Sequence, residues 1–152
     1  MDADIVDLKT LVDICQWTKT VLFLDDCHGA GVIGKTGRGT PEYCGVPINQ
    51  IDAYCSTMAK GLSGGGGGYI VGSSALAIWL KQRSRTYIFS NAICPPIVNC
   101  AWRSVQILKD NPEWIQKRDK NAAYFRKLMR ANGFTIKGND DCPICPVWMT
   151  DE

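Results

Sequence analysis

The stretch Ile51–Gly72 reads IDAYCSTMAKGLSGGGGGYIVG, and the expected fold follows from it. The apolar segments 51–58 and 68–72 that border the stretch have the composition of β-strands. A single lysine, Lys60, and a run of five glycines lie between them. The pattern predicts two strands joined by a loop of small residues, with one amine at the start of the loop.

Three interpretations of this loop compete. A phosphate-binding P-loop carries its lysine after the glycines, whereas Lys60 precedes them, which excludes that motif. A flexible linker is the plainer alternative, and it stays open, although glycine-rich linkers are usually flanked by polar rather than apolar segments. The third is a lysine that condenses with an aldehyde cofactor, because small neighbours allow the backbone to approach a flat ring.

Pyridoxal phosphate (PLP) is the aldehyde cofactor that this third interpretation favours. It needs a lysine, ligands for its phosphate and an acidic partner for its pyridine nitrogen. The hydroxyls of Ser56 and Thr57, just before the lysine, are candidates for the phosphate. The acidic partner must come from elsewhere in the chain.

A second apolar run, Val21–Leu24, ends in Asp25 and is typical of a buried parallel strand. Ligand sites of open α/β sheets lie at such strand ends, which makes Asp25 the candidate partner of the ring nitrogen. His28, the one histidine in the chain, follows three residues later. Taken singly, Asp25 could also be a turn cap and His28 an ordinary loop residue.

Further elements follow from hydrophobic periodicity and from helix start and stop residues. The segment 27–45 is rich in glycine and is expected to be an irregular loop. Helices are expected at 5–19, 75–83, 95–110 and 112–132, and strands of a smaller sheet at 134–137 and 144–149. Together these elements indicate an α/β fold, with part of a large domain at 1–94 and a linking helix plus part of a small α+β domain at 95–152.

Composition limits the classes of function. The 152 residues are 45% hydrophobic and 21% charged, with a net charge of +2. So small a charge indicates neither nucleic-acid binding nor membrane attachment. Most of the eight cysteines lie among apolar residues, which favours reduced thiols in a reducing compartment. Cys142 and Cys145 have the CxxC spacing but lack the two further ligands of a zinc site, so no metal is expected.

Three ordered segments resemble the α-oxoamine synthases, which are fold-type-I PLP enzymes. DDCHGAGVIGKTGRG (25–39) is similar to their D-(D/E)-x-H-x-x-G-x-x-G-x-x-G-R-G element. STMAKGLSGGGGGY (56–69) is similar to T-x-x-K-(A/S)-x-G-x-x-G-G-Y. LKQRSRTYIFSNA (80–92) resembles a segment of one branch, the glycine C-acetyltransferases.

The resemblance implies a role for each matching residue. Lys60 would form the Schiff base with the cofactor, Asp25 would pair with the pyridine nitrogen, and His28 would hydrogen-bond the phenolic oxygen of the ring. Thr57 would bind the cofactor phosphate. Ser90 would reach the phosphate in the partner subunit, since the family forms its active site between two subunits.

The implied enzyme is an acyltransferase of threonine catabolism that joins glycine and acetyl-CoA into 2-amino-3-oxobutyrate and CoA. The resemblance also implies a homodimer, located in the mitochondrial matrix in a eukaryote and in the cytoplasm otherwise. The matched motifs cover the middle of such an enzyme, so a fragment with little activity of its own is expected. Two alternatives stay open: another α-oxoamine synthase with a different acyl-CoA, or a non-catalytic subunit that pairs with an intact homologue.

Overall fold

The computed structural model describes residues 1–63 and 65–149. One member of the glycine run, at position 64, thus lies outside the described residues. Strands β1 and β2 and helices α1, α3, α5 and α6 lie within a few residues of where the sequence predicts them. The elements are α1 (Leu8–Thr18), β1 (Phe23–Asp25), α2 (Thr40–Cys44), a 3-10 turn (Ile48–Gln50), β2 (Ala53–Thr57), β3 (Gly68–Gly72), α3 (Ser74–Arg83), α4 (Arg85–Phe89), α5 (Pro95–Asp110), α6 (Glu113–Ala131), β4 (Thr135–Ile136) and β5 (Val147–Trp148).

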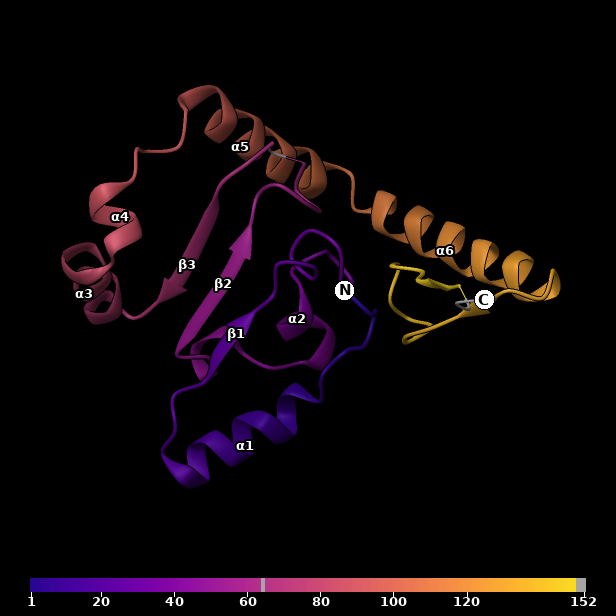
Figure 1. Ribbon diagram of the computed structural model, residues 1–152, viewed down its shortest axis with the longest axis horizontal. Coiled ribbons are helices and arrows are strands. Elements are labelled where there is room, and N and C mark those ends of the chain that lie inside the picture. Colours follow the sequence, from indigo (N-terminus) through magenta and orange to yellow (C-terminus); the bar gives the residue numbers. More distant parts are fainter. Residues whose placement is uncertain (64, 150–152) are drawn as a thin grey trace.

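A three-stranded sheet in the order β1-β2-β3 lies at the centre of the molecule (Figure 1). β1 runs parallel to β2, with Asp25 opposite Cys55, whereas β3 returns antiparallel to β2, with Tyr69 opposite Ser56. Because β1 and β2 run in the same direction, both end at the same edge of the sheet. The loop after β1 and the lysine loop after β2 therefore start side by side.

Helix α1 covers one face of β1. The Asp7 side chain accepts a hydrogen bond from the backbone N–H of Thr10 at 3.2 Å and caps the start of the helix. The apolar stripe of α1, which includes Leu8 and Val12, is buried in the main core. The core cluster consists of Leu8, Val12, Leu22, Leu24, Ala30, Val46, Ile51 and Tyr54.

The expectation that β1 is buried throughout is wrong. Leu22 and Leu24 face the core, but Phe23 is 57% exposed and Val21 is also exposed. Successive side chains of a strand point to opposite faces of its sheet. Within the described residues only the face toward α1 is covered at β1, so the other half of the apolar run stays open.

The expectation of an irregular loop over 27–45 is also wrong in part, because α2 occupies its end. The helix begins with Thr40-Pro41-Glu42, which places proline in the first turn and an acidic residue near the positive end of the helix. The glycines upstream conceal this start signal. The short helix α4 was likewise not expected, and β4 and β5 have two residues each instead of four and six.

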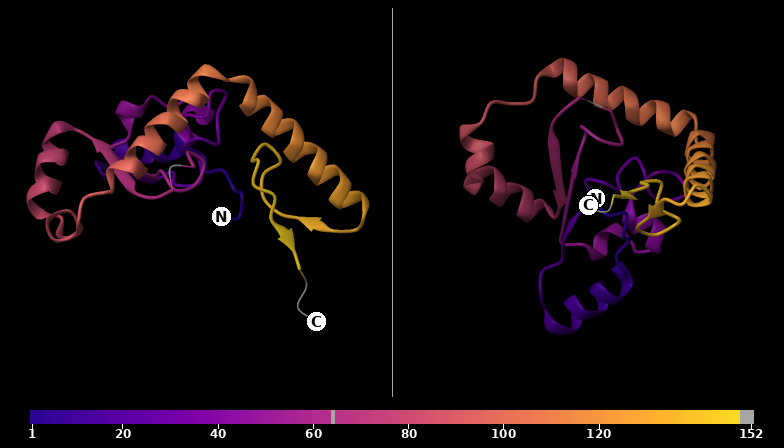
Figure 2. Two further views of the ribbon diagram at one scale, coloured as in Figure 1. Left: turned by 90° about the horizontal axis from the view of Figure 1, so that it is seen from above. Right: turned by 45° about the vertical axis from the view of Figure 1, so that its right-hand side comes forward.

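Helices α5 and α6 meet at an angle and form an arch, with the β4-β5 pair beneath α6 (Figure 2). The buried guanidinium of Arg126, in α6, holds the segment before β5. Its Nη atoms donate to four backbone carbonyls, and its exposed fraction is 3%. The acceptors are Lys137 at 3.2 Å, Asn139 at 3.0 Å, Cys142 at 2.9 Å and Ile144 at 2.6 Å. One side chain therefore organises the small sheet and its loop.

No helix in residues 1–63 and 65–149 combines the length and apolarity that crossing a bilayer requires.

Candidate functional site

The structure brings Asp25, His28 and Lys60 together at the shared edge of β1 and β2. Asp25 is the last residue of β1, His28 lies in the turn that follows, and Lys60 lies three residues beyond the end of β2. His28 and Lys60 are 32 residues apart in the sequence, yet their nitrogens approach to 3.1 Å. Parallel pairing of the two strands produces this convergence.

The carboxylate of Asp25 is exposed and favours its ionised form. Its Oδ1 accepts a hydrogen bond from the backbone N–H of Cys27 at 2.9 Å. The hydrogen bonds from Cys27 lower the pKa of Asp25, and the nearby charges of Lys60 and His28 lower it further. At neutral pH the site therefore presents a fixed negative charge at a strand end.

The contact between Lys60 and His28 joins a primary amine to an imidazole. Lys60 Nζ donates to His28 Nε2 in the tautomer that carries its proton on Nδ1. Partial burial lowers the pKa of His28, and the positive charge of Lys60 lowers it further. A neutral imidazole beside an amine can hold that amine in place or exchange a proton with it.

The neighbouring Asp26 is buried and fixes the turn that carries His28. Its carboxylate accepts from Thr40 N–H at 3.0 Å, Thr40 O–H at 2.5 Å and Tyr54 O–H at 2.9 Å. Its backbone carbonyl accepts from the N–H groups of Gly29 and Ala30. Asp26 thus links the end of β1 to α2 and to β2.

Thr57 closes the lysine loop with its hydroxyl. The oxygen accepts from the backbone N–H of Ala59 at 3.1 Å, and the O–H donates to the carbonyl of Gly67 at 2.9 Å. These bonds bring the start and the end of the loop together. The hydroxyl lies at the base of the segment that carries Lys60.

Small residues let the two loops of the site pack against each other. A Cβ atom on Gly61 would lie 2.7 Å from the carbonyl oxygen of Ala30 and would overlap the Val32 side chain. Gly31, across the contact, has a φ of +78°, which favours glycine. Position 61 therefore has no room for a side chain, and Lys60 is held against the loop that carries His28.

Ser90 is not brought together with the other predicted residues. It is exposed at the end of α4, and that helix lies beyond β3, on the opposite side of the sheet from β1 (Figure 1). It makes no hydrogen bond to Asp25, His28 or Lys60 in the described residues.

Two hollows adjoin the loop that follows β1. One, of about 230 Å³, is lined by Asp25, His28, Thr40 and residues near the N-terminus. A larger one, of about 500 Å³, lies between the loop at Ile33 and helix α6 and is lined by Arg118, Asp119 and Asp140 among others. The first adjoins two of the predicted residues, and the second adjoins none of them.

Sequence reasoning missed three residues of the site: Asp26, Cys27 and Cys55. A signal existed for Asp26, because it directly follows Asp25 at the end of an apolar strand. Successive side chains of a strand point to opposite faces, so one of the two carboxylates must point toward the core. Cys27 and Cys55 carry no local signal, since the strand register and the turn after β1 together bring them close. The hydrogen bond with Asp25 raises the pKa of the Cys27 thiol to about 11, and partial burial contributes to the rise.

The chain is similar to known proteins over its whole length. The model of the family "Aminotransferase class I and II" matches residues 1–147. The 2-amino-3-ketobutyrate coenzyme A ligase, mitochondrial, of Mus musculus is 40% identical over 151 residues, which are 99% of this chain and 36% of that protein. The 8-amino-7-oxononanoate synthase of Coprothermobacter proteolyticus is 38% identical over 152 residues, which are 100% of this chain and 38% of that protein.

A solved structure of serine palmitoyltransferase from S. paucimobilis, with a bound PLP–myriocin aldimine, superposes with a TM-score of 0.89 at 27% identity. It matches 100% of this chain and 39% of its own. The chain thus spans well under half the length of each of these three proteins.

Proposed function

Because this chain belongs to the aminotransferase class I and II family, we propose that it is part of a PLP-dependent acyltransferase that joins glycine and acetyl-CoA into 2-amino-3-oxobutyrate and CoA. The observation that carries the proposal is the 3.1 Å approach of Lys60 Nζ to His28 Nε2 beside the ionised carboxylate of Asp25. These three groups match the parts that α-oxoamine synthases use. The name of the mouse relative supports the choice of substrates.

The donor set fits PLP. A carboxylate with a lowered pKa suits a protonated ring nitrogen, and a primary amine suits an aldehyde carbon. We propose that Asp25 holds the ring nitrogen, that His28 faces the phenolic oxygen and that Lys60 holds the cofactor covalently through Nζ. Thr57 and, from a second subunit, Ser90 are the proposed phosphate ligands.

When bound, PLP supplies an electron-withdrawing ring that stabilises negative charge at the Cα of glycine. The residues of this chain do the remaining work. Asp25, which stays ionised, keeps the positive charge on the ring nitrogen. Once the amine of glycine has freed Lys60, Nζ removes the Cα proton. The adjacent His28 keeps Nζ in place through its Nε2 atom.

For Thr57 to bind a phosphate, its hydroxyl must exchange a partner. The O–H now donates to Gly67, and a phosphate oxygen in reach would take that hydrogen bond. We propose that cofactor binding loosens the closed loop at this point.

We also propose that residues 1–94 are part of a large cofactor-binding domain and that residues 95–152 form a linking helix and part of a small domain. The complete protein is proposed to be a homodimer.

Reductive trapping tests the cofactor. The purified chain is incubated with PLP and reduced with borohydride, and the modified peptide is identified by mass. We expect the label on Lys60 and none in the Lys60→Ala variant. Lys35→Ala is the matched control, because Lys35 is an exposed lysine in the loop after His28. A label spread over many surface lysines would contradict the proposal.

A second candidate has a specific observation in its favour. The 8-amino-7-oxononanoate synthase is 38% identical, close to the 40% of the mouse ligase, so another acyl-CoA is the alternative. CoA release from a panel of acyl-CoA thioesters, with the 152-residue chain and with any longer gene product that carries it, separates the two. Preference for acetyl-CoA with glycine supports the first candidate.

The proposed location follows the relatives. The mouse ligase is named as mitochondrial. We propose the mitochondrial matrix if the source is a eukaryote and the cytoplasm otherwise.

A further inference from the structure

Two cysteines and Asp25 converge at the edge of the sheet where β1 and β2 end. The carboxylate oxygen of Asp25 and the sulfur atoms of Cys27 and Cys55 all lie within 4.8 Å of one another. Cys55 is the register partner of Asp25 across the parallel strands, and Cys27 follows Asp25 by two residues. The strand pairing therefore fixes Asp25 and Cys55, and the turn after β1, in which the Cys27 N–H donates to Asp25 Oδ1, places Cys27 beside them.

The family motifs do not require either cysteine. Cys27 occupies the variable position of the D-(D/E)-x-H element, and Cys55 lies just before the element that begins at Ser56. Both thiols are unpaired and only partly buried. Neither thiol has a proposed role in binding PLP, so both are available to bind another ligand.

Two thiolates and one carboxylate are a ligand set suited to Zn²⁺. The raised pKa of Cys27 keeps its thiol protonated in the metal-free chain, so metal binding must release that proton. Bond lengths of about 2.3 Å to sulfur and about 2.0 Å to oxygen place tetrahedral ligands about 3.5–3.8 Å apart. Separations of no more than 4.8 Å need only a small side-chain rotation to reach that range. Asp25 is exposed, so water has access to the fourth position.

We propose that Asp25, Cys27 and Cys55 bind a thiophilic divalent cation, with Zn²⁺ as the physiological candidate. A second part rests on the proposed function. A cation on Asp25 repels the protonated ring nitrogen that this carboxylate would otherwise hold, so metal and cofactor exclude each other. Zinc would then act as an inhibitor at the base of the cofactor site.

Cobalt titration of the reduced, metal-free chain tests the site, because thiolate ligands give Co²⁺ an intense charge-transfer absorption. We expect one equivalent of Co²⁺ with this band, and displacement of the Co²⁺ by Zn²⁺. Loss of one direct ligand, in Cys27→Ser or in Cys55→Ser, weakens binding by more than the roughly tenfold that loss of an outer-shell partner costs. Asp25→Asn keeps the band but also binds more weakly.

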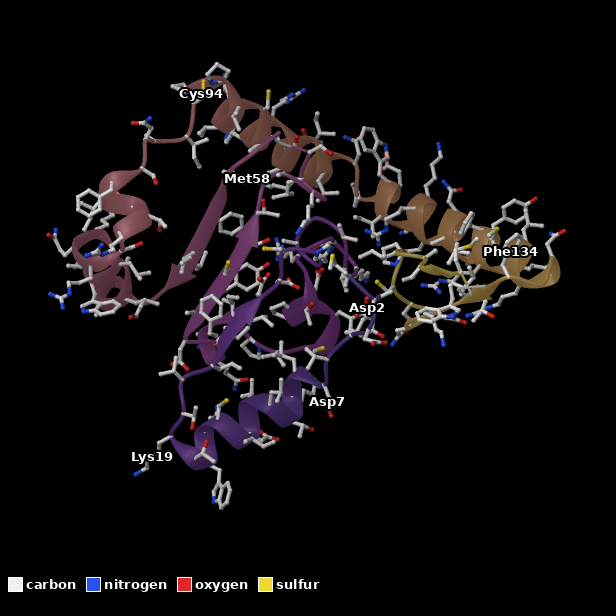
Figure 3. The ribbon with its side chains drawn as sticks, viewed as in Figure 1. Asp2, Asp7, Lys19, Met58, Cys94 and Phe134 are labelled. Atoms are coloured by element: carbon white, nitrogen blue, oxygen red, sulfur yellow. The ribbon has the colours of Figure 1, made fainter. Side chains whose placement is uncertain are left out.

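Two further cysteines provide matched controls. Cys94 is exposed just before α5, away from the sheet edge (Figure 3). Cys145 belongs to the CxxC pair near β5. Cys94→Ser and Cys145→Ser should bind as the unmodified chain does. Absence of binding, a band that persists in the Cys27→Ser/Cys55→Ser double variant, or loss of the band in either control overturns the site.

Competition tests the second part. Borohydride trapping of PLP on Lys60 is repeated with and without one equivalent of Zn²⁺. We expect zinc to suppress the label in the unmodified chain but not in the double cysteine variant. If zinc changes the labelling of the two chains to the same extent, the mutual exclusion of metal and cofactor is refuted. If PLP fails to label the metal-free chain, the proposed function fails, while the cobalt titration still decides the metal site.

Discussion

The hydrogen bond from Tyr54 to Asp26 allows a measurable prediction about how the site is held. Tyr54 is 7% exposed, and its hydroxyl donates to Asp26 Oδ2 at 2.9 Å. Burial raises the pKa of Tyr54, and the Asp26 charge raises it further, so the hydroxyl stays a donor over the ordinary pH range. Tyr54→Phe removes this donor and little else.

The magnitude follows from the kind of bond. A hydrogen bond to a charged group contributes about 1.5–3 kcal/mol. Thr40 still supplies two donors to the carboxylate in the variant, so the loss should lie near the middle of the range. We expect the free energy of unfolding to fall by about 2 kcal/mol. This corresponds to a factor of about 30 in the unfolding equilibrium.

Urea denaturation followed by far-ultraviolet circular dichroism measures the effect. With a slope of about 2 kcal/mol per molar, the midpoint should fall by about 1 M urea. Tyr69→Phe is the matched control, because Tyr69 lies opposite Ser56 on β3 and its hydroxyl has no hydrogen bond in the described residues. The control should change stability by less than about 0.5 kcal/mol.

High pH gives an independent check on the same bond. The native pKa of Tyr54 lies above that of an unfolded tyrosine, so the unfolded state releases its proton first. Tyr54 therefore costs the native state stability as pH rises above about 10. The gap between the unmodified chain and Tyr54→Phe should narrow there. Equal midpoints for Tyr54→Phe and Tyr69→Phe at neutral pH would refute the assigned role of the Asp26 network.

Three further predictions concern the loops and the small sheet. Gly61→Ala should cost about 1–3 kcal/mol of stability in urea denaturation, because its Cβ meets the Ala30 carbonyl, whereas Gly66→Ala, whose nearest contact is 3.7 Å away, should not. The lowered pKa of His28 means that the unfolded state binds its proton first, so the free energy of unfolding should fall as pH drops below about 6.5, and His28→Gln should flatten that dependence. Arg126→Met leaves four carbonyls without their donor and should cost about 3 kcal/mol, measured as an earlier thermal or urea transition; an unchanged transition would contradict the clamp.

Local sequence patterns were enough to predict the strands and helices that carry the site. The apolar run before Asp25 and the strand before Lys60 both lie where expected, because length, flanking residues and β-branched or aromatic content agree there. Helix α2 was missed because upstream glycines dominate its surroundings. The exposed half of β1 could not be foreseen, since burial depends on which elements cover a face and not on the strand itself.

The candidate site was predictable only where a motif exists. Asp25, His28 and Lys60 share segments with recognisable order, and the structure brings them together. Their roles remain predictions, as do those of Thr57 and Ser90. The neighbourhood of Cys27 and Cys55 depends on strand register, a non-local property that no single segment of the sequence encodes.

The separations along the chain have a consequence for how this geometry arises. Tyr54 meets Asp26 across 28 residues, and Lys60 meets His28 across 32. Contacts this distant carry a loop-closure entropy that must be overcome before they stabilise anything. A synthetic peptide covering residues 20–45 would contain Asp25 and His28 but would leave their side chains without a fixed arrangement. The site should therefore mature late in folding, when the second parallel strand docks.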